Sequence, residues 1–385
     1  MPDSQRPLVL LAEGCLTPLD AKTAVGLLRY RPERVAAVLD STRAGRTAAD
    51  CVGVGGAIPV VADLTAAAVH GAGALLIGIA PAGGVLPERW RAVVRDALVR
   101  GWDVVSGLHR FLANDPEFRE LAARHGATLF DVRRPPADAP LASGRAASLT
   151  ALVVLTVGSD CNVGKMTAAL ELTRSLARAG DRAEFVATGQ TGILIAGRGA
   201  AIDAVPADFA AGVAERLVLE AASRADVVVV EGQGTLRHPA FSGVALSLLH
   251  GSAPAALVLC HEAGRDALRS LPPGERREIP SLAQLRDEVE RAAALVCEAR
   301  VIAVALNTVS LDEAAAREAC ARAAAELGVP ATDPVRYGAE PLASAVRVAR
   351  DQRAAAASAR ATPTRARGAV GADVMGPEAN HASQA

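Results

Sequence analysis

The sequence predicts an α/β protein of two domains, an N-terminal Rossmann-like parallel-sheet domain and a C-terminal P-loop NTPase-like α/β domain. Short apolar runs alternate with amphipathic helical stretches along most of the chain, a pattern typical of βαβ units. A glycine-containing loop joins a buried strand to a helix near residue 160, as in phosphate-binding folds. The length of 385 residues is also too great for one ordinary domain.

The composition bounds the class of protein. Hydrophobic residues make up 51% of the chain and charged residues 22%, which is enough to form a core. Lysine and arginine number 41 and aspartate and glutamate 42, so the net charge of −1 offers no basic surface to nucleic acid or to an anionic membrane. The six cysteines include no CxxC pair, and no apolar stretch reaches about 18 residues. We expect a cytoplasmic protein without a nucleic-acid or membrane partner.

Residues 1–132 carry the pattern of the first domain. The loop at residues 12–20 has one glycine and lacks the G-x-G-x-x-G sequence of dinucleotide-binding domains. We expect a degenerate Rossmann-like domain that forms the interface of a homo-oligomer or closes over the substrate. The expected strands are residues 8–12, 34–39, 74–79, 103–106 and 128–132, and the expected helices are residues 18–28, 87–99 and 116–125.

Three prolines and little periodicity indicate a linker at residues 133–148. A second α/β pattern fills residues 149–350. From residue 351 the chain has no apolar pattern, so residues 351–385 are expected to form a disordered tail. The strands expected in the second domain are residues 152–157, 182–187, 227–230, 256–260 and 301–306, and the helices are residues 165–179, 206–222, 282–299 and 312–327.

The strongest chemical signal is Gly158-Ser-Asp-Cys-Asn-Val-Gly-Lys165, which follows an apolar run. Successive backbone N–H groups of such a loop can surround a phosphate, and the positive end of the following helix adds to the attraction. Gly164 lets the main chain approach the ligand closely, and Lys165 neutralises its charge. We expect this loop to hold the diphosphate of a cosubstrate.

The loop departs from the usual G-x-x-x-x-G-K-[ST] pattern in two ways. Five residues separate Gly158 from Gly164, so Ser159 stands at the place of the first glycine. Met166 stands where a Mg²⁺-binding hydroxyl is usual, and Thr167 follows one residue later. Phosphate binding survives both changes because it rests on the backbone and on Lys165. Tight Mg²⁺ coordination does not survive, because the usual hydroxyl is missing. No metal site is therefore predicted.

A second chemical signal is a carboxylate after a buried strand. Four valines at residues 227–230 lead into Glu231-Gly-Gln-Gly234. Ligands of open parallel sheets bind outside the carboxyl ends of the strands, so Glu231 is placed to take a proton from a substrate or to bind a metal through water. The alternative is a Glu231 that only caps a helix or forms a salt bridge.

These motifs resemble those of known P-loop proteins. The phosphate loop and the Glu231 segment resemble the nucleotide loop and glutamate strand of dethiobiotin synthetase and its relatives. Asn307-Thr308, after the strand expected at residues 301–306, is similar to the purine-reading asparagine loop of that class. Residues 332–338 stand where its last nucleotide loop would be. The resemblance implies that Asn307 contacts an adenine base.

A closer resemblance covers roughly residues 8–346. Met166 after the lysine, Ala187-Thr-Gly-Gln-Thr-Gly192 and Cys260-His-Glu-Ala-Gly264 are similar to motifs of a family long described as a domain of unknown function. That family pairs a Rossmann-like with a P-loop domain, and its named members are DgcN-type D-glutamate N-acetyltransferases, which use acetyl-CoA. The resemblance implies an acyltransferase that moves an acetyl group from acetyl-CoA to the amino group of a D-amino acid, with D-glutamate preferred.

Acetyl transfer needs a base for the amine, donors to the oxyanion and cations for an acidic acceptor. The N–H groups of residues 232–234 are candidate oxyanion donors. The candidate bases are Glu231, Asp203 and His261, and the candidate acceptor-binding residues are Gln190, Gln233, Arg237, His238 and Arg265. The expected cosubstrate contacts are Ser159, Asp160, Cys161, Asn162, Val163, Gly164, Lys165, Met166, Thr167 and Asn307.

Two other functions stay open at this point. An ATP- and Mg²⁺-dependent ligase or phosphotransferase of the dethiobiotin-synthetase type would use Lys165, Thr167 and Glu231 to organise Mg·ATP. Met166 favours acetyl transfer over that reaction, because acetyl transfer does not depend on the metal. A nucleotide-sensing module without catalysis would leave Glu231 and Asp203 without a role.

Overall fold

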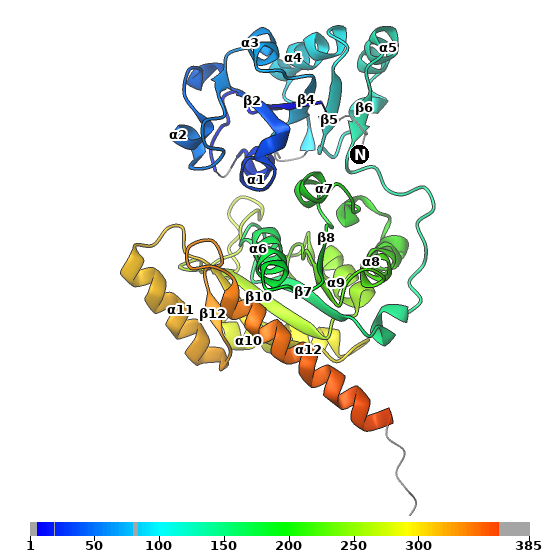
Figure 1. Ribbon diagram of the computed structural model, residues 1–385, viewed down its shortest axis with the longest axis vertical. Helices are drawn as coiled ribbons and strands as arrows, with labels where there is room; N and C mark the ends of the chain where they lie inside the picture. The colour runs from blue at the N-terminus through cyan, green and yellow to red at the C-terminus, as the bar shows by residue number, and fades with distance from the viewer. Residues whose placement is uncertain (1–5, 19, 80–83, 362–385) are drawn as a thin grey trace, which may run out of the picture.

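The computed structural model describes residues 6–18, 20–79 and 84–361, which form two α/β units joined by one segment (Figure 1). Each unit contains a six-stranded sheet, and all strand pairs in both sheets are parallel. The predicted fold class is confirmed.

The first sheet has the strand order β3-β2-β1-β4-β5-β6 of a Rossmann fold. The five expected strands are present, and the sequence misses β3, because two residues are too few to show a pattern. The strands are β1 (Leu8–Leu11), β2 (Val35–Leu39), β3 (Val60–Val61), β4 (Ala74–Ile77), β5 (Asp103–Ser106) and β6 (Leu129–Asp131). The helices are α1 (Lys22–Tyr30), α2 (Ala48–Val52), α3 (Leu64–Val69), α4 (Glu88–Val99) and α5 (Pro116–His125).

The second sheet has the order β12-β11-β10-β7-β9-β8. Its central strand β7 has β9 on one side and β10 on the other, so the direction in which strands are added reverses there, which is where open sheets bind ligands. The strands are β7 (Leu152–Gly158), β8 (Ala183–Val186), β9 (Val227–Val230), β10 (Ala256–Glu262), β11 (Arg300–Asn307) and β12 (Ala331–Thr332). The helices are α6 (Lys165–Arg178), α7 (Gln190–Ala196), α8 (Ala207–Ala222), α9 (Ser242–Ser252), α10 (Leu282–Ala293), α11 (Glu313–Leu327) and α12 (Glu340–Ala361).

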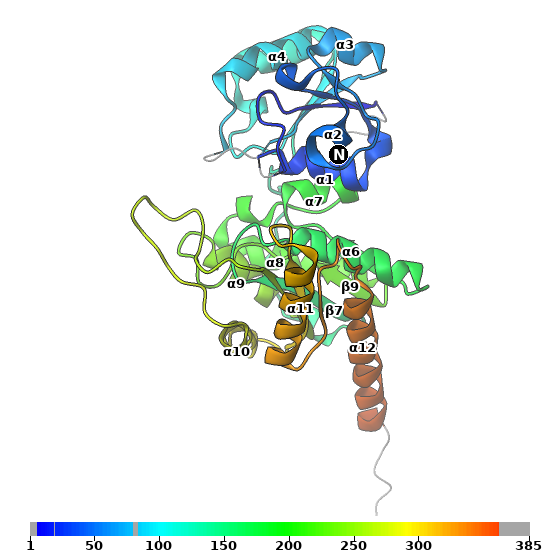
Figure 2. The same ribbon diagram turned by 90° about the vertical axis from the view of Figure 1, so that its left-hand side faces the viewer.

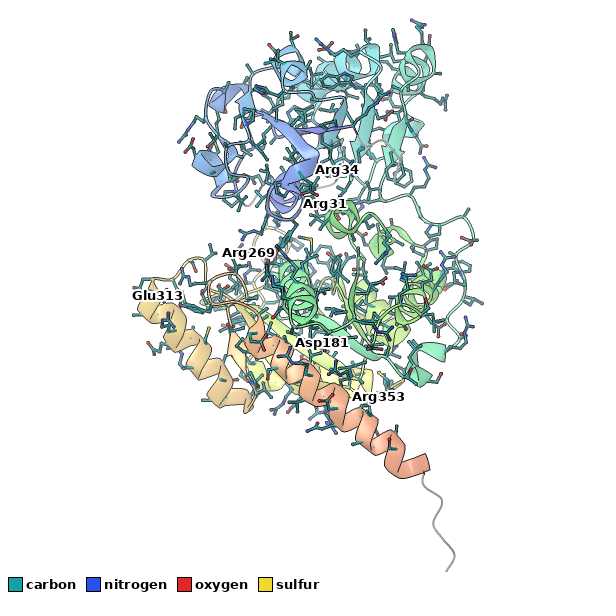
Figure 3. All side chains as sticks on the ribbon, viewed as in Figure 1. Arg31, Arg34, Asp181, Arg269, Glu313 and Arg353 are labelled. Carbon is teal, nitrogen blue, oxygen red and sulfur yellow. The ribbon has the colours of Figure 1, made fainter. Side chains whose placement is uncertain are left out.

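Helix α12 corrects the expected start of the tail. It continues through residues 351–361, which the sequence placed in a disordered segment. Arg350 Nη1 donates to Asp181 Oδ1 at 2.6 Å, and Arg353 Nη2 donates to Leu149 O at 3.1 Å (Figure 3 labels Asp181 and Arg353). Alanine, which is abundant in this stretch, also has the highest helix propensity. Residues 362–385 lie outside the described residues.

The segment at residues 133–148 lies against α8. Ser143 N donates to Glu215 Oε2 at 2.6 Å, and Ala146 N donates to Glu215 Oε1 at 3.2 Å. Gly212 of α8 is required there, because a Cβ at this residue would clash with Pro140 O. The segment therefore connects the two units, as a linker does, but much of it packs against α8.

Helix α1 of the first unit lies on α7 of the second, as both views show (Figures 1 and 2). Thr23 Oγ1 and Thr191 Oγ1 share a hydrogen bond of 2.9 Å, and Arg31 Nη1 donates to Ile195 O at 2.7 Å. A Cβ on Gly26 would lie only 2.7 Å from Thr191 Cγ2, so glycine permits this close approach. Since α1 follows β1 and α7 follows β8, the carboxyl ends of both sheets face the junction.

Arg133 connects the same two edges. Its Nε donates to Gly107 O, after β5, at 2.7 Å, and its Nη2 donates to Gln190 Oε1 at 2.7 Å. Its Nη1 forms an ion pair with Asp203. The Arg133 and Asp203 side chains are 8% and 23% exposed, so water screens the pair only in part. Arg133 therefore holds the loops after β5 and β8 together.

We expect Arg133→Ala to weaken the junction by about 3 kcal/mol, because the Asp203 carboxylate loses its partner. Both tryptophans, Trp90 and Trp102, lie in the first unit. Tryptophan fluorescence therefore follows that unit alone, whereas circular dichroism follows both. In a guanidinium titration the two signals should coincide for the wild type and separate for the variant. Arg134→Ala, at a side chain that is 54% exposed, is the control. Coincident transitions at the wild-type midpoint in Arg133→Ala would contradict this role.

No helix among the described residues is both long and apolar enough to cross a membrane.

Candidate functional site

The chain between β7 and α6 forms a nest of backbone amides. Asn162 and Gly164 have positive φ angles of 59° and 102°, which curl the chain between the two elements. No amide from residue 160 to residue 165 donates a hydrogen bond to another described residue. Ser159 differs, because its N–H donates to Cys260 O at 3.0 Å. The remaining amides fit the oxygens of a phosphate.

Lys165 reaches back across this nest. Its Nζ donates to Asp160 O at 2.7 Å, and a Cβ on Gly158 would lie 2.9 Å from it. The residue is 6% exposed, and this burial lowers the pKa of the ammonium group. A buried cation inside a ring of free amide donors is an arrangement that an anionic ligand would stabilise.

Asp160 and Arg265 support the loop from within the protein. Arg265 Nη1 donates to Asp160 Oδ2 at 2.9 Å and to Cys161 O at 2.7 Å, and Arg269 N donates to the same Asp160 oxygen at 2.9 Å. The Asp160 and Arg265 side chains are both buried. These contacts give Arg265 a supporting role in the loop, and the acceptor contact expected for it from the sequence stays a prediction.

Met166 belongs to the junction between the units. Its Cε lies 3.9 Å from the position of a Cβ on Gly26, and it packs against a core that residues of both units share. Thr167 is half-buried at the next position of α6. Within residues 6–18, 20–79 and 84–361 no three or more His, Cys, Asp or Glu side chains are arranged to hold a metal ion. The residue at the usual hydroxyl position therefore serves packing.

Asn307 ends β11 beside the start of α6. Its Cβ is 4.0 Å from the Cβ position of Gly164, and its Oδ1 accepts from Val309 N at 3.2 Å. Its Nδ2 donates to none of the described residues, which suits the base contact expected for it. The neighbouring loop is held by Asp333, whose Oδ2 accepts from Thr308 N at 2.9 Å and from Thr308 Oγ1 at 2.6 Å.

Glu231 lies at the carboxyl end of β9 and is 6% exposed. Its Oε2 accepts from the amides of Thr188 at 3.0 Å and Gly189 at 3.1 Å, just before α7, whereas its Oε1 accepts from no described residue. Burial raises the pKa of the carboxyl to about 7, although the two amides and Lys165 oppose the shift. Gly192 approaches so closely that a Cβ there would clash with Oε2. Glu231 is therefore a buried carboxyl that can exchange a proton near neutral pH.

Several other predicted site residues already have partners. Asp203 and Gln190 both bind Arg133, so the Asp203 carboxylate already has a cationic partner within the protein. Gln233 Nε2 donates to Thr188 O, beside Glu231. Gly232 N donates to Thr156 Oγ1 at 2.9 Å, which removes this amide from the candidate oxyanion donors.

The two predicted histidines differ in their surroundings. His261 Nδ1 lies 2.9 Å from Ser159 Oγ, and burial, with a contribution from Arg265, lowers the pKa of the ring. His238 is buried: its Nε2 is hydrogen-bonded to Arg269 O at 3.0 Å and its Nδ1 accepts from Ala240 N at 3.1 Å. Both ring nitrogens of His238 are thus used within the protein, and the acceptor contact expected for it stays a prediction.

Arg237 is likewise paired, since its Nε donates to Glu288 Oε2 at 2.8 Å. The pair borders a small pocket, part of it open to solvent, on the side of β7 that faces α9 and α10. Leu155, Leu249 and Leu285 line it, and Gly158 and the segment after Glu231 form its polar edge.

Two residues at the junction belong to no motif of the sequence. Arg133 stands in a segment with the composition of a linker, and nothing in the sequence marks it. Lys22, the first residue of α1, interacts electrostatically with Cys161 of the loop. In the sequence Lys22 stands out only because lysine is rare: Lys22 and Lys165 are the two lysines of the chain.

Comparisons with known proteins agree with the two-unit architecture. Residues 41–135 match the family model described as "Domain of unknown function (DUF1611_N) Rossmann-like domain", and residues 140–343 match "Domain of unknown function (DUF1611_C) P-loop domain". A crystal structure of a DUF1611 family protein from Anabaena variabilis superposes with a TM-score of 0.84 at 39% identity, covering 89% of this chain and 99% of that one.

Two curated relatives carry a functional name, D-glutamate N-acetyltransferase. The protein from Tritonibacter scottomollicae is 36% identical over 343 residues, which are 89% of this chain and 98% of the relative. The protein from a Pseudoalteromonas species is 40% identical over 276 residues, which are 71% of this chain and 81% of the relative.

Proposed function

Because the chain belongs to the DUF1611 family, matching its Rossmann-like and P-loop domain models in order, we propose that it is a D-glutamate N-acetyltransferase that uses acetyl-CoA. The observation that carries the proposal is that two features lie side by side at one edge of the second sheet. A phosphate loop with methionine at the usual hydroxyl position lies beside a buried carboxyl whose pKa is raised to about 7.

The loop suits coenzyme A. Its diphosphate would lie in the free amides of residues 160–165 with Lys165 as counter-charge, and Asn307 Nδ2 would meet the adenine. Magnesium supplies much of the rate in phosphoryl transfer but is not required for thioester aminolysis, so Met166 is compatible with this cosubstrate.

Glu231 is the general base of the proposed reaction. Its Oε1 takes a proton from the acceptor ammonium group, and the free amine attacks the thioester carbonyl carbon. The C–N bond forms, the attacking nitrogen loses its second proton, the tetrahedral oxyanion collapses and the C–S bond breaks. The coenzyme leaves as a thiolate that takes up the proton lost by the nitrogen. A base with a pKa near 7 is matched to working pH. His261, which is half-buried beside Ser159, is the second candidate for proton transfer.

The test is to incubate the purified protein with acetyl-CoA and D-glutamate without magnesium and to follow thiol release. Equimolar thiol and N-acetyl-D-glutamate, the latter identified by mass, are the expected products. L-Glutamate and D-alanine in parallel assays separate stereochemical preference from side-chain preference. Absence of thiol release, together with ATP hydrolysis that magnesium stimulates, would overturn the proposal in favour of a dethiobiotin-synthetase-type reaction.

A further inference from the structure

The chain uses lysine at only two positions. All but two of its 41 basic residues are arginine, and the exceptions are Lys22 and Lys165. Lys165 is the lysine of the phosphate loop, whereas Lys22 belongs to the other domain and lies far away in sequence. The structure nevertheless brings Lys22 to the same loop, where its charge interacts with the Cys161 thiol.

The position of Lys22 is fixed by the contact between α1 and α7. Lys22 is the first residue of α1, and the next residue, Thr23, is hydrogen-bonded to Thr191 at 2.9 Å. One turn further, Gly26 meets Thr191 and Met166, the residue that follows Lys165. The packing of α1 on the second domain thus sets the Lys22 side chain beside the loop.

Among the residues that the structure describes, Lys22 has no ion-pair partner. Its side chain is half-buried, and it forms no hydrogen bond or ion pair with any residue in the described parts of the chain. The nearby acid, Asp20, accepts a hydrogen bond from Thr17 Oγ1 at 2.8 Å. Arg265 and Arg269 add further positive charge, and Figure 3 places Arg269 at the junction below α1. Burying an unpaired ammonium among like charges is unfavourable unless an anion joins them.

We propose that Lys22 is a second phosphate-binding cation, supplied to the loop by the Rossmann-like domain. Its ligand is the diphosphate of the cosubstrate, so the identity of that cosubstrate, though not the role of Lys22, rests on the proposed function. A lysine suits the task because its compact ammonium group can turn its three N–H donors toward tetrahedral phosphate oxygens. The proposal gives the first domain a direct part in cosubstrate binding.

The test compares Lys22→Ala with the wild type in calorimetric titrations with coenzyme A, without any reaction. Loss of one charge-assisted contact should weaken binding about 10- to 100-fold. Arg29→Ala is the control, because Arg29 is exposed on the same helix, about 10 Å further along. Equal affinities of Lys22→Ala and wild type would overturn the proposal.

A second measurement excludes a general structural effect. With S-acetylpantetheine, which lacks the phosphates, as acetyl donor, Lys22→Ala should keep wild-type kcat/KM, whereas with acetyl-CoA its KM should rise. An equal loss with both donors would overturn the phosphate role. If the wild type binds Mg·ATP and not coenzyme A, and Lys22→Ala weakens ATP binding, the acetyltransferase proposal falls while the role of Lys22 stands.

Discussion

A protein carrying Lys165→Met is expected to bind coenzyme A about 30- to 150-fold more weakly than the wild type and to unfold at a higher temperature. A charge-assisted hydrogen bond from a buried ammonium to phosphate contributes about 2–3 kcal/mol, and Lys165 has nearly its whole side chain inside the loop. Methionine occupies a similar volume above Gly158 but avoids the desolvation of a charge. Affinity and stability should therefore change in opposite directions.

Calorimetric titration with coenzyme A measures the first effect, and a thermal melt without ligand measures the second. Arg178→Met, at the exposed end of the same helix, is the matched control and should leave both unchanged. Wild-type affinity in Lys165→Met would remove the phosphate-loop assignment. A lower melting temperature would show that Lys165 is needed for the fold.

The second large effect is expected from Glu231→Gln, which should lower kcat about 10²- to 10⁴-fold and leave the affinity for coenzyme A unchanged. In the wild type, kcat at saturating acceptor should rise about tenfold per pH unit below pH 7 and level off above it, because the base must lose its proton at a pKa of about 7. Glu184→Gln is the control: Glu184 lies on the neighbouring strand β8 and pairs with Arg198 and Arg224. A wild-type pH profile in Glu231→Gln would exclude Glu231 as the base.

The same residue predicts a pH dependence of stability. The pKa of Glu231 is raised on folding, from an ordinary value of about 4.5, so the folded state holds a proton that the unfolded state releases between about pH 4.5 and 7. Its contribution to the free energy of unfolding is complete below pH 4.5 and is lost by pH 7, a fall of about 3 kcal/mol. Glu231→Gln should lack this fall and be the more stable protein at pH 8, as urea titrations at several pH values can show.

The fold could be predicted because parallel strands buried on both faces are continuous apolar runs. Val227–Val230 and Leu152–Gly158 are such runs, and both occur as expected. The strands at Val60–Val61 and Ala331–Thr332 leave no comparable pattern, since two residues cannot show a periodicity. The helix at Ala207–Ala222 has an apolar face that is visible in sequence, whereas α12 extends into a stretch with no such face.

The phosphate loop could also be predicted, because its chemistry belongs to consecutive residues. The partners of side chains from separate loops could not. Arg265 follows β10, and the fold turns its side chain to the loop, where it meets Asp160. Arg237 is paired with Glu288, which lies 51 positions away. Lys22 and Arg133 reach the site only through the way two domains pack together, which no local pattern describes.

The residue at position 166 can either supply a magnesium ligand or contact the other domain, but not both. The side chain that could carry a magnesium ligand instead touches the helix that brings Lys22 to the loop. A threonine in its place would restore a hydroxyl but would be too short to reach that helix. Anyone who wished to convert this protein into a magnesium-dependent ATPase would therefore have to rebuild a surface in the other domain at the same time.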